Sequence, residues 1–210
     1  MSEIKDLLGD EELFFAVYKI FAEFRKKKNK MKTTVFVFHP HLDESSKVNK
    51  LYVQKLKDAG YEVRDLYKLY PDFKIDVAQE QAALTAADRI VLLFPMYWYS
   101  SPALLKQWED DVLAYGWAYG GTTRALEGKE LLLVVSAGAP AEVYTHEHAY
   151  TVTDLLRPFQ ASAAYTGMKY LKPYITTGAL GISSAVLAEK AQRLIDYIKS
   201  TDIGELGTHE

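Results

Sequence analysis

The sequence contains no cysteine among its 210 residues, and this absence removes several kinds of chemistry. Disulfide bonds, thiol catalysis and iron–sulfur clusters held by cysteine are all excluded. Any redox chemistry would therefore depend on a cofactor that the chain borrows.

Long hydrophobic runs and a strong excess of charge are missing as well. No apolar stretch approaches the roughly 20 residues that a membrane-spanning helix needs, and residues 1–6 lack the basic-then-apolar order of a secretory signal. A net charge of −3 provides no basic surface for nucleic acid. With 49% hydrophobic and 25% charged residues, the composition is typical of a soluble globular protein, and we expect a cytoplasmic location.

Strands and helices alternate in the pattern of the sequence from residue 32 onward. Runs rich in β-branched and aromatic residues predict strands at 33–38, 61–66, 89–94, 131–135 and 168–176, separated by helical patterns at 46–59, 77–87, 102–115, 151–165 and 184–200. This alternation predicts an α/β fold with a five-stranded parallel sheet and helices on both faces. In such sheets ligands bind beyond the carboxyl ends of the strands, which selects the loops 39–49, 95–101 and 136–150.

Residues 1–30 stand apart from this pattern. Apolar residues recur there at helical spacing, and a basic run at 25–30 suits the negative end of a helix. We therefore expect an N-terminal helical extension over 1–30 and a ligand-binding domain over 31–210. Scattered acidic residues oppose a membrane-surface helix, so packing on the main domain or on a second subunit is the expected role.

The first loop has the composition of a phosphate site. Ser45 and Ser46 stand where a helix is predicted to start, with free backbone N–H groups and the positive end of the helix dipole. Lys47 and Asn49 add further donors, so a phosphate fits, although helix capping by serine alone is an equally ordinary interpretation. The spacing matches neither G-x-G-x-x-G nor G-x-x-x-x-G-K, which disfavours a dinucleotide-fold dehydrogenase and a nucleotide hydrolase.

A metal site is a further interpretation of the same loop. His39, His41 and Asp43 alternate and could converge on an ion. Alternation on a loop does not fix a coordination geometry and no further ligand set is evident, so we predict no metal.

The second loop is unusually aromatic for a segment that follows a buried strand. Tyr97, Trp98 and Tyr99 come directly after Pro95 and Met96. Exposed rings favour a ligand or partner surface, where main-chain groups could meet the polar edge of a planar heterocycle while side chains pack on its faces. A well-filled core or a subunit interface is the alternative.

The third loop consists of small residues followed by protonatable ones. Ser136-Ala137-Gly138-Ala139 lets the backbone approach a ligand closely, or forms an ordinary turn. Tyr144, His146, His148 and Tyr150 follow it, and each histidine taken alone is more often simply solvated.

From Met31 to about Tyr197 the chain resembles the flavodoxin-like NAD(P)H:quinone oxidoreductases. This family includes DT-diaphorase and the ancillary oxidoreductases of glutathione-gated potassium efflux systems. The resemblance is carried by FPMYWYSSPALLKQW at 94–108 and YGWAYG at 115–120, and LYKLYPDF at 66–73 resembles the efflux-ancillary branch.

The resemblance implies a flavodoxin-like sheet of order 2-1-3-4-5 and bound FMN. It implies two-electron, ping-pong reduction of quinones or similar electrophiles by NADH or NADPH. FMN is expected rather than FAD because little C-terminal extension is available to hold an adenosine.

Site residues follow from the same resemblance by position. It assigns the flavin phosphate to His39, Ser45, Ser46, Lys47, Val48 and Asn49, one side of the isoalloxazine to Pro95, Met96, Tyr97, Trp98 and Tyr99, and the opposite edge to Ser136, Ala137, Gly138 and Ala139. At 136–139 Ser-Ala-Gly-Ala replaces the usual Thr-Thr-Gly-Gly. Tyr144 aligns with a tyrosine that assists proton balance, Tyr150 aligns with its histidine partner, and Trp117 and Tyr119 are expected walls of the substrate pocket.

Two other functional classes and an assembly state complete the expectations. The chain could be a regulatory flavoprotein subunit that docks on and activates a potassium efflux transporter, which would place it at the inner face of the cell membrane. A one-electron carrier is disfavoured by the wide aromatic loop and by the lack of a strongly acidic surface. An apolar wall of Trp98, Trp108 and Trp117, together with the dimeric family, predicts a homodimer.

Overall fold

The structure of the protein is a computed structural model that describes Phe15 and residues 31–207. The chain divides into two units, 1–32 and 33–210, and the fold below is that of the second. Apart from Phe15, the helix expected over 1–30 lies outside the described residues.

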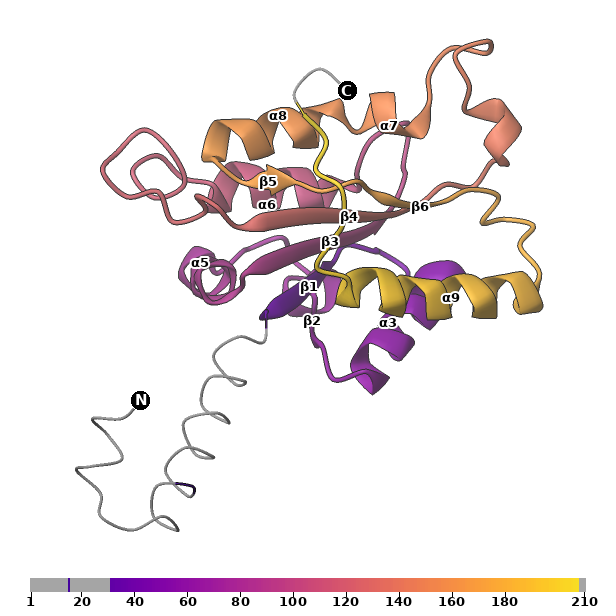
Figure 1. The fold of residues 1–210 in the computed structure, drawn as a ribbon, viewed down its shortest axis with the longest axis horizontal. Helices are drawn as coiled ribbons and strands as arrows, with labels where there is room; N and C mark the ends of the chain where they lie inside the picture. The colour runs from indigo at the N-terminus through magenta and orange to yellow at the C-terminus, as the bar shows by residue number, and fades with distance from the viewer. Residues whose placement is uncertain (1–14, 16–30, 208–210) are drawn as a thin grey trace. The chain divides into compact units, whose positions relative to one another are not determined.

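Strands and helices alternate along the second unit, as Figure 1 shows. The strands are β1 (Thr33–Val37), β2 (Glu62–Asp65), β3 (Arg89–Pro95), β4 (Glu130–Ser136), β5 (Lys169–Tyr170) and β6 (Tyr174–Thr176). The helices are α3 (Val48–Asp58), α4 (Leu66–Leu69), α5 (Val77–Ala86), α6 (Ala103–Val112), the 3-10 turn η1 (Ala141–Val143), α7 (Val152–Leu155), α8 (Arg157–Thr166) and α9 (Ser184–Lys199).

The strands form one parallel sheet in the order β2-β1-β3-β4-β5, with β6 also paired to β4. This order confirms the flavodoxin-like prediction. The single fifth strand expected over 168–176 is instead divided into β5 and β6. Pro173 lies between them without an N–H to donate, and the Lys172 N–H turns away to donate to the Gly204 carbonyl at 2.8 Å.

The outer side of β5 is covered by residues close to the C-terminus. Leu171 forms an antiparallel bridge with Glu205, and the Leu206 N–H donates to the Tyr170 carbonyl at 2.9 Å. This segment therefore runs alongside β5 as a short additional partner.

Apolar residues alternate between two cores because both faces of the sheet are covered by helices. Phe36 and Leu133 face the core that α5, α6 and α8 close, whereas Val35 and Leu132 face the core that α3 and α9 close. In Figure 1, α6 and α8 lie on one side of the sheet and α3 and α9 on the other.

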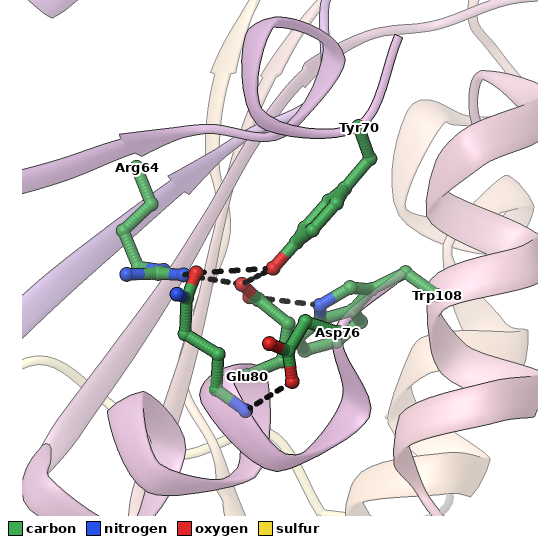
Figure 2. A network of polar contacts seen from close by, with 6 residues as sticks. Arg64, Tyr70, Asp76, Glu80 and Trp108 are labelled. Carbon is green, nitrogen blue, oxygen red and sulfur yellow. Dashed lines mark hydrogen bonds and ion pairs between the residues drawn. The ribbon is translucent and has the colours of Figure 1, made fainter. Parts of the chain in front are cut away.

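A buried polar network centred on Glu80 borders the core that α5, α6 and α8 close. The Glu80 side chain on α5 is fully buried; it forms an ion pair with Arg64 and accepts hydrogen bonds from the Tyr70 hydroxyl at 2.7 Å and Trp108 Nε1 at 3.1 Å (Figure 2). The network ties β2, α4, α5 and α6 together. Burial, and then the Glu80 carboxylate, raise the pKa of Tyr70 to about 12.

Trp108 is therefore a core residue, and its expected place in an exposed aromatic wall is wrong. Only 2% of its surface is accessible, and its ring packs 5.5 Å from the rings of Phe36 and Phe38. The indole N–H is the donor that the buried Glu80 needs.

Several element boundaries differ from the sequence pattern for local reasons. The strand expected to reach Leu66 ends at Asp65, whose carboxylate accepts the Lys68 N–H and starts α4. The helix expected over 151–165 is divided at Leu156 into α7 and α8. No helix in the described part of the chain is both long and apolar enough to cross a bilayer.

Candidate functional site

The three selected loops emerge at one edge of the sheet, because β1, β3 and β4 are parallel neighbours. The second and third loops are joined directly where the Met96 N–H donates to the Ser136 carbonyl at 2.7 Å. The first loop starts beside them, since the Phe38 N–H donates to the Leu93 carbonyl at 2.8 Å. The sequence-predicted loops therefore lie side by side at the strand ends.

The helix of the first loop begins later than predicted. Helix α3 starts at Val48, two residues beyond the expected start, and Ser46 Oγ accepts the Asn49 N–H at 3.2 Å. Ser45 is exposed in the preceding turn, with its N–H bound to the His41 carbonyl at 3.2 Å. Ser46 thus caps the helix through its oxygen while its hydroxyl hydrogen can still be donated to a ligand.

His39 is a buried neutral donor beside this turn. Its Nδ1 accepts the His41 N–H at 3.1 Å, which places the proton of the neutral ring on Nε2. Burial first, and the neighbouring His41 second, lower the pKa of His39 to about 4. Lys47 is exposed and Val48 is buried, so the cationic side chain stands at the outer side of the helix start.

Asn49 carries a buried polar group that the described part of the chain leaves unpaired. Its side chain is 1% exposed, and its Oδ1 has no hydrogen-bond partner. A buried carbonyl without a partner costs about 1–3 kcal/mol. A ligand that donates a hydrogen bond would satisfy this oxygen, and an acceptor would be satisfied by the amide nitrogen, since the two amide atoms can exchange places by rotation.

The second loop is a tight turn held in a strained conformation. Tyr97 and Ser100 exchange two backbone hydrogen bonds of 3.0 Å, and between them Trp98 and Tyr99 have φ values of 49° and 62°. Such turns favour Asn-Gly, and strained non-glycine residues cluster at functional sites. Trp98 is 95% exposed, so the strain serves to present rings rather than to bury them.

The third loop is fixed by a neighbouring segment that sequence reasoning missed. The carbonyls of Ala137, Gly138 and Ala139 accept N–H groups from residues 178–180 at distances of 2.6–3.4 Å. The Ala137 N–H donates to the Thr176 carbonyl at 2.8 Å. The N–H groups of Gly138 and Ala139 have no partner within the described residues and are available to the edge of a planar ligand.

Leu180 belongs to this neighbouring segment. Its side chain is 87% exposed, and a Cβ added at Gly138 would lie 3.2 Å from its Cδ1. The only signal for the segment in the sequence is Thr-Thr-Gly at 176–178, which reads as an ordinary turn after a strand.

The expected proton-transfer residues are not joined to each other. Tyr144 is half-buried at the end of η1, whereas Tyr150 is 62% exposed, and no hydrogen bond links them in the described chain. His146 pairs with Asp154 at 2.8 Å, an interaction that, after bonds from Thr151, keeps the pKa of Asp154 below its usual range.

Of the two expected substrate walls, Tyr119 lies at the cleft between α6 and α8 and Trp117 does not line it. Tyr119 lines a cleft of about 510 Å³ together with Ser100 and Ser101, and its ring lies 5.2 Å from that of Tyr165. Trp117 is half-buried against the adjoining core. This cleft therefore continues the aromatic turn along one face of the sheet.

Metal-ligating side chains do not gather in the described part of the chain, where no group of three could hold an ion. His41 of the alternating trio instead pairs with Glu44 at 3.2 Å. The backbone carbonyl of Asp43 accepts a hydrogen bond from the Lys50 ammonium at 2.9 Å.

Comparison with known proteins gives a consistent picture. Residues 31–198 match the model of a family described as having a flavodoxin-like fold. An uncharacterized NAD(P)H oxidoreductase of Bacillus subtilis is 51% identical over 173 residues, covering 81% of this chain and 99% of that protein.

Two further relatives carry more specific descriptions. The ancillary protein of a glutathione-regulated potassium-efflux system from Klebsiella pneumoniae is 42% identical over 163 residues, 76% of this chain and 92% of that protein. The crystal structure of general stress protein 14 from Treponema denticola in complex with FMN is 38% identical, with a TM-score of 0.72 over 80% of this chain and 95% of that one.

Proposed function

Because the chain belongs to the flavodoxin-like family of NAD(P)H:quinone oxidoreductases, we propose that it binds FMN and uses NADH or NADPH to reduce quinones or similar electrophiles. The observation that carries the proposal lies at the strand ends, where the first loop leads into α3. There the buried side-chain carbonyl of Asn49, at the start of α3, has no hydrogen-bond partner within the described chain. The FMN complex of a 38% identical relative supports the choice of cofactor.

The phosphate end of the site is provided by the first loop. Ser46, Lys47 and Asn49 would donate to the phosphate together with the first N–H groups of α3, and Ser45 and Val48 complete the turn around it. His39 would donate from Nε2. A neutral imidazole donor suits a buried site, because an uncompensated buried cation is expensive before the ligand arrives.

The ring end is provided by the second and third loops. Bound FMN supplies the hydride chemistry. The segment Pro95–Tyr99 would pack on the ring, and the N–H groups of Gly138 and Ala139 would donate to its polar edge, where fixed dipoles stabilise negative charge. Ser136 and Ala137 hold that edge in place through the sheet.

Proton transfer and substrate placement follow from the surrounding side chains. We assign the proton role to Tyr144 with Tyr150, and the walls of the donor and acceptor pocket to Trp117 and Tyr119. Because NAD(P)H and the electron acceptor are proposed to use the same face of the flavin in turn, a ping-pong scheme follows.

The test combines cofactor identification with kinetics. The purified protein should release FMN on heating, and initial rates with NAD(P)H and a small benzoquinone should give parallel double-reciprocal lines. Release of FAD or of no flavin would refute the cofactor, and intersecting lines would refute the shared face.

A regulatory role is the second candidate, favoured by the 42% identical efflux-system ancillary protein. In that case the chain acts in the cytoplasm at the inner face of the membrane and activates a potassium efflux transporter by docking on it. Potassium efflux would be measured in cells that express a candidate efflux transporter, with and without this protein. A difference would separate this role from quinone reduction alone.

We also propose that the active form is a homodimer, with residues 31–210 as the flavin-binding domain and 1–30 as an extension. Large exposed aromatics remain near the site, including Trp98, Tyr99, Tyr115 and Tyr165, and rings of this size are enriched at interfaces. Light scattering should give about twice the chain mass of 23.8 kDa, and a monomeric mass would contradict the proposal.

A further inference from the structure

A buried hydroxyl pair connects the two ends of the proposed flavin site. The Tyr52 hydroxyl lies 2.7 Å from Thr176 Oγ1, and both residues have no accessible surface. Tyr52 is on α3, one turn after Asn49, whereas Thr176 is the last residue of β6. The two residues are 124 positions apart in the sequence, so the bond joins parts of the chain that are remote in sequence.

Thr176 is the anchor of the third loop. It pairs in register with Ser136, and its carbonyl accepts the Ala137 N–H at 2.8 Å. The residues after it, 178–180, hold the carbonyls of the same loop. A displacement of Thr176 would therefore displace the backbone N–H groups that are proposed to meet the ring.

We propose that Tyr52 and Thr176 are positioning residues that fix the start of α3, at the phosphate, relative to loop 136–139, at the ring edge. This inference rests on the proposed binding of FMN. A ligand that engages both ends gains most when their separation is set in advance, because less ordering remains to be done on binding.

The chemistry of the pair suits a fixed connection. Burial raises the pKa of Tyr52, so its hydroxyl stays protonated and bonded. Either hydroxyl can be the donor. Removing the Tyr52 hydroxyl leaves Thr176 Oγ1 buried without this partner, which costs more than the bond itself contributes.

Tyr174 provides a matched control on the same strand. Its ring lies 6.2 Å from that of Tyr52, and its hydroxyl donates to the Lys190 carbonyl at 2.7 Å. That bond joins β6 to α9, which contributes no proposed flavin contact. The Tyr174 hydroxyl also interacts with that of Tyr52, so Tyr174→Phe removes a neighbour of the Tyr52 hydroxyl while it leaves the bond from Tyr52 to Thr176 in place.

The experiment compares full-length Tyr52→Phe, Thr176→Val, Thr176→Ser and Tyr174→Phe. Fluorescence-quenching titrations would give dissociation constants for FMN and riboflavin, and thermal unfolding of the flavin-free proteins would report stability. Tyr52→Phe and Thr176→Val should each weaken FMN by roughly tenfold, the size of one buried hydrogen bond. Binding of riboflavin, which lacks the phosphate, should weaken by no more than about twofold. The ratio of FMN affinity to riboflavin affinity should therefore fall.

The controls separate positioning from stability. Thr176→Ser keeps the hydroxyl and should restore the wild-type ratio. Tyr174→Phe should lower the unfolding temperature as Tyr52→Phe does, but leave the ratio and the visible circular dichroism of bound FMN unchanged. If Tyr52→Phe fails to fold, the affinity ratios of Thr176→Val and Thr176→Ser decide whether the hydroxyl pair positions the two ends of the site.

Two results would overturn different conclusions. Wild-type protein that binds FMN, with variants whose FMN and riboflavin affinities fall equally or not at all, would reduce Tyr52 and Thr176 to core residues. Wild-type protein that binds no flavin would instead refute the proposed function, and this inference with it.

Discussion

Glu80 and Asn49 are both buried polar residues, yet their surroundings differ in kind. Glu80 has an ion pair and two further hydrogen bonds from Tyr70 and Trp108. Asn49 has a carbonyl with no partner, beside a histidine that burial keeps neutral. Both oxygens of the Glu80 carboxylate have donors within the described chain, whereas the side-chain carbonyl of Asn49 has none.

Glu80 is thus a polar group that holds the fold, and Asn49 is the polar group that we propose to meet a ligand. A saturated buried network contributes rigidity, and losing one member leaves the others without partners. An incomplete one stores a cost that only a bound molecule removes. The turn at Trp98 and Tyr99 combines positive φ with exposed side chains, so its strain too is not repaid by burial of those rings in the described structure.

The largest expected effect comes from removing the phosphate end. Replacing Ser46 and Asn49 by alanine should weaken FMN binding by about 3–6 kcal/mol, since each hydrogen bond to a charged group contributes about 1.5–3. Riboflavin should lose little, because it has no phosphate. Fluorescence-quenching titration of both ligands measures the difference.

Ser183→Ala is the matched control for this pair of substitutions. Ser183 caps α9 by accepting the Val186 N–H at 3.3 Å, so its loss costs a helix cap without touching the site. Equal losses of FMN and riboflavin in the Ser46/Asn49 variant would show that the first loop does not hold the phosphate.

Disruption of the network around Glu80 should lower the stability of the fold and leave ligand affinity unchanged. Glu80→Ala removes the ion-pair partner of the mostly buried Arg64, which keeps its bond to Gln79. It should lower the free energy of unfolding by about 3–5 kcal/mol while the folded fraction keeps its FMN affinity. Urea denaturation checks this. Glu189→Ala, which breaks an exposed pair with Arg193, should cost no more than about 1 kcal/mol; a similar cost for both would contradict the comparison.

His39 should make the flavin-free protein sensitive to acid. Its pKa of about 4 in the folded chain lies below the ordinary 6.5, so the unfolded chain takes up the proton first as the pH falls. Stability is therefore retained above about pH 6.5 and declines between there and about pH 4, by up to about 3 kcal/mol.

Denaturation curves across this pH range measure the effect of His39. His39→Gln should flatten the decline, whereas His146→Gln, at an exposed histidine, should not. An unchanged slope in His39→Gln would place the proton uptake elsewhere.

The smallest expected effect is a gain in stability at the strained turn. Replacing Trp98-Tyr99 with Asn-Gly suits positive φ at both positions and should add about 1 kcal/mol to the free energy of unfolding. FMN and riboflavin should both bind more weakly, because both carry the ring. An Ala-Ala variant should show the same loss of binding without the gain, and stabilisation by Ala-Ala would refute the role of strain.

The fold could be predicted from the sequence because its signals are local and repeated. Central strands such as 90–94 read as continuous apolar runs, and five predicted strands separated by helices predict a parallel sheet. Boundaries failed where one side chain decides them, as Asp65 does by capping α4 and Pro173 by dividing the fifth strand.

The candidate site was predicted as three loops but not as a set of contacts. Residues 39–49, 95–101 and 136–150 follow strand ends, so the topology alone places them together. The bond between Tyr52 and Thr176 has no local signal, and the burial of Trp108 depends on a carboxylate 28 positions away. Such pairings follow from packing, which no short pattern records.

The segment at Gly204–Leu206 has a consequence for association between molecules. An outer strand presents unpaired N–H and C=O groups that can template the strand of another chain. The bridge from Leu171 to Glu205 and the bond from Leu206 to Tyr170 occupy these groups along β5. The protein thereby closes that edge of its sheet to edge-to-edge aggregation with its own residues.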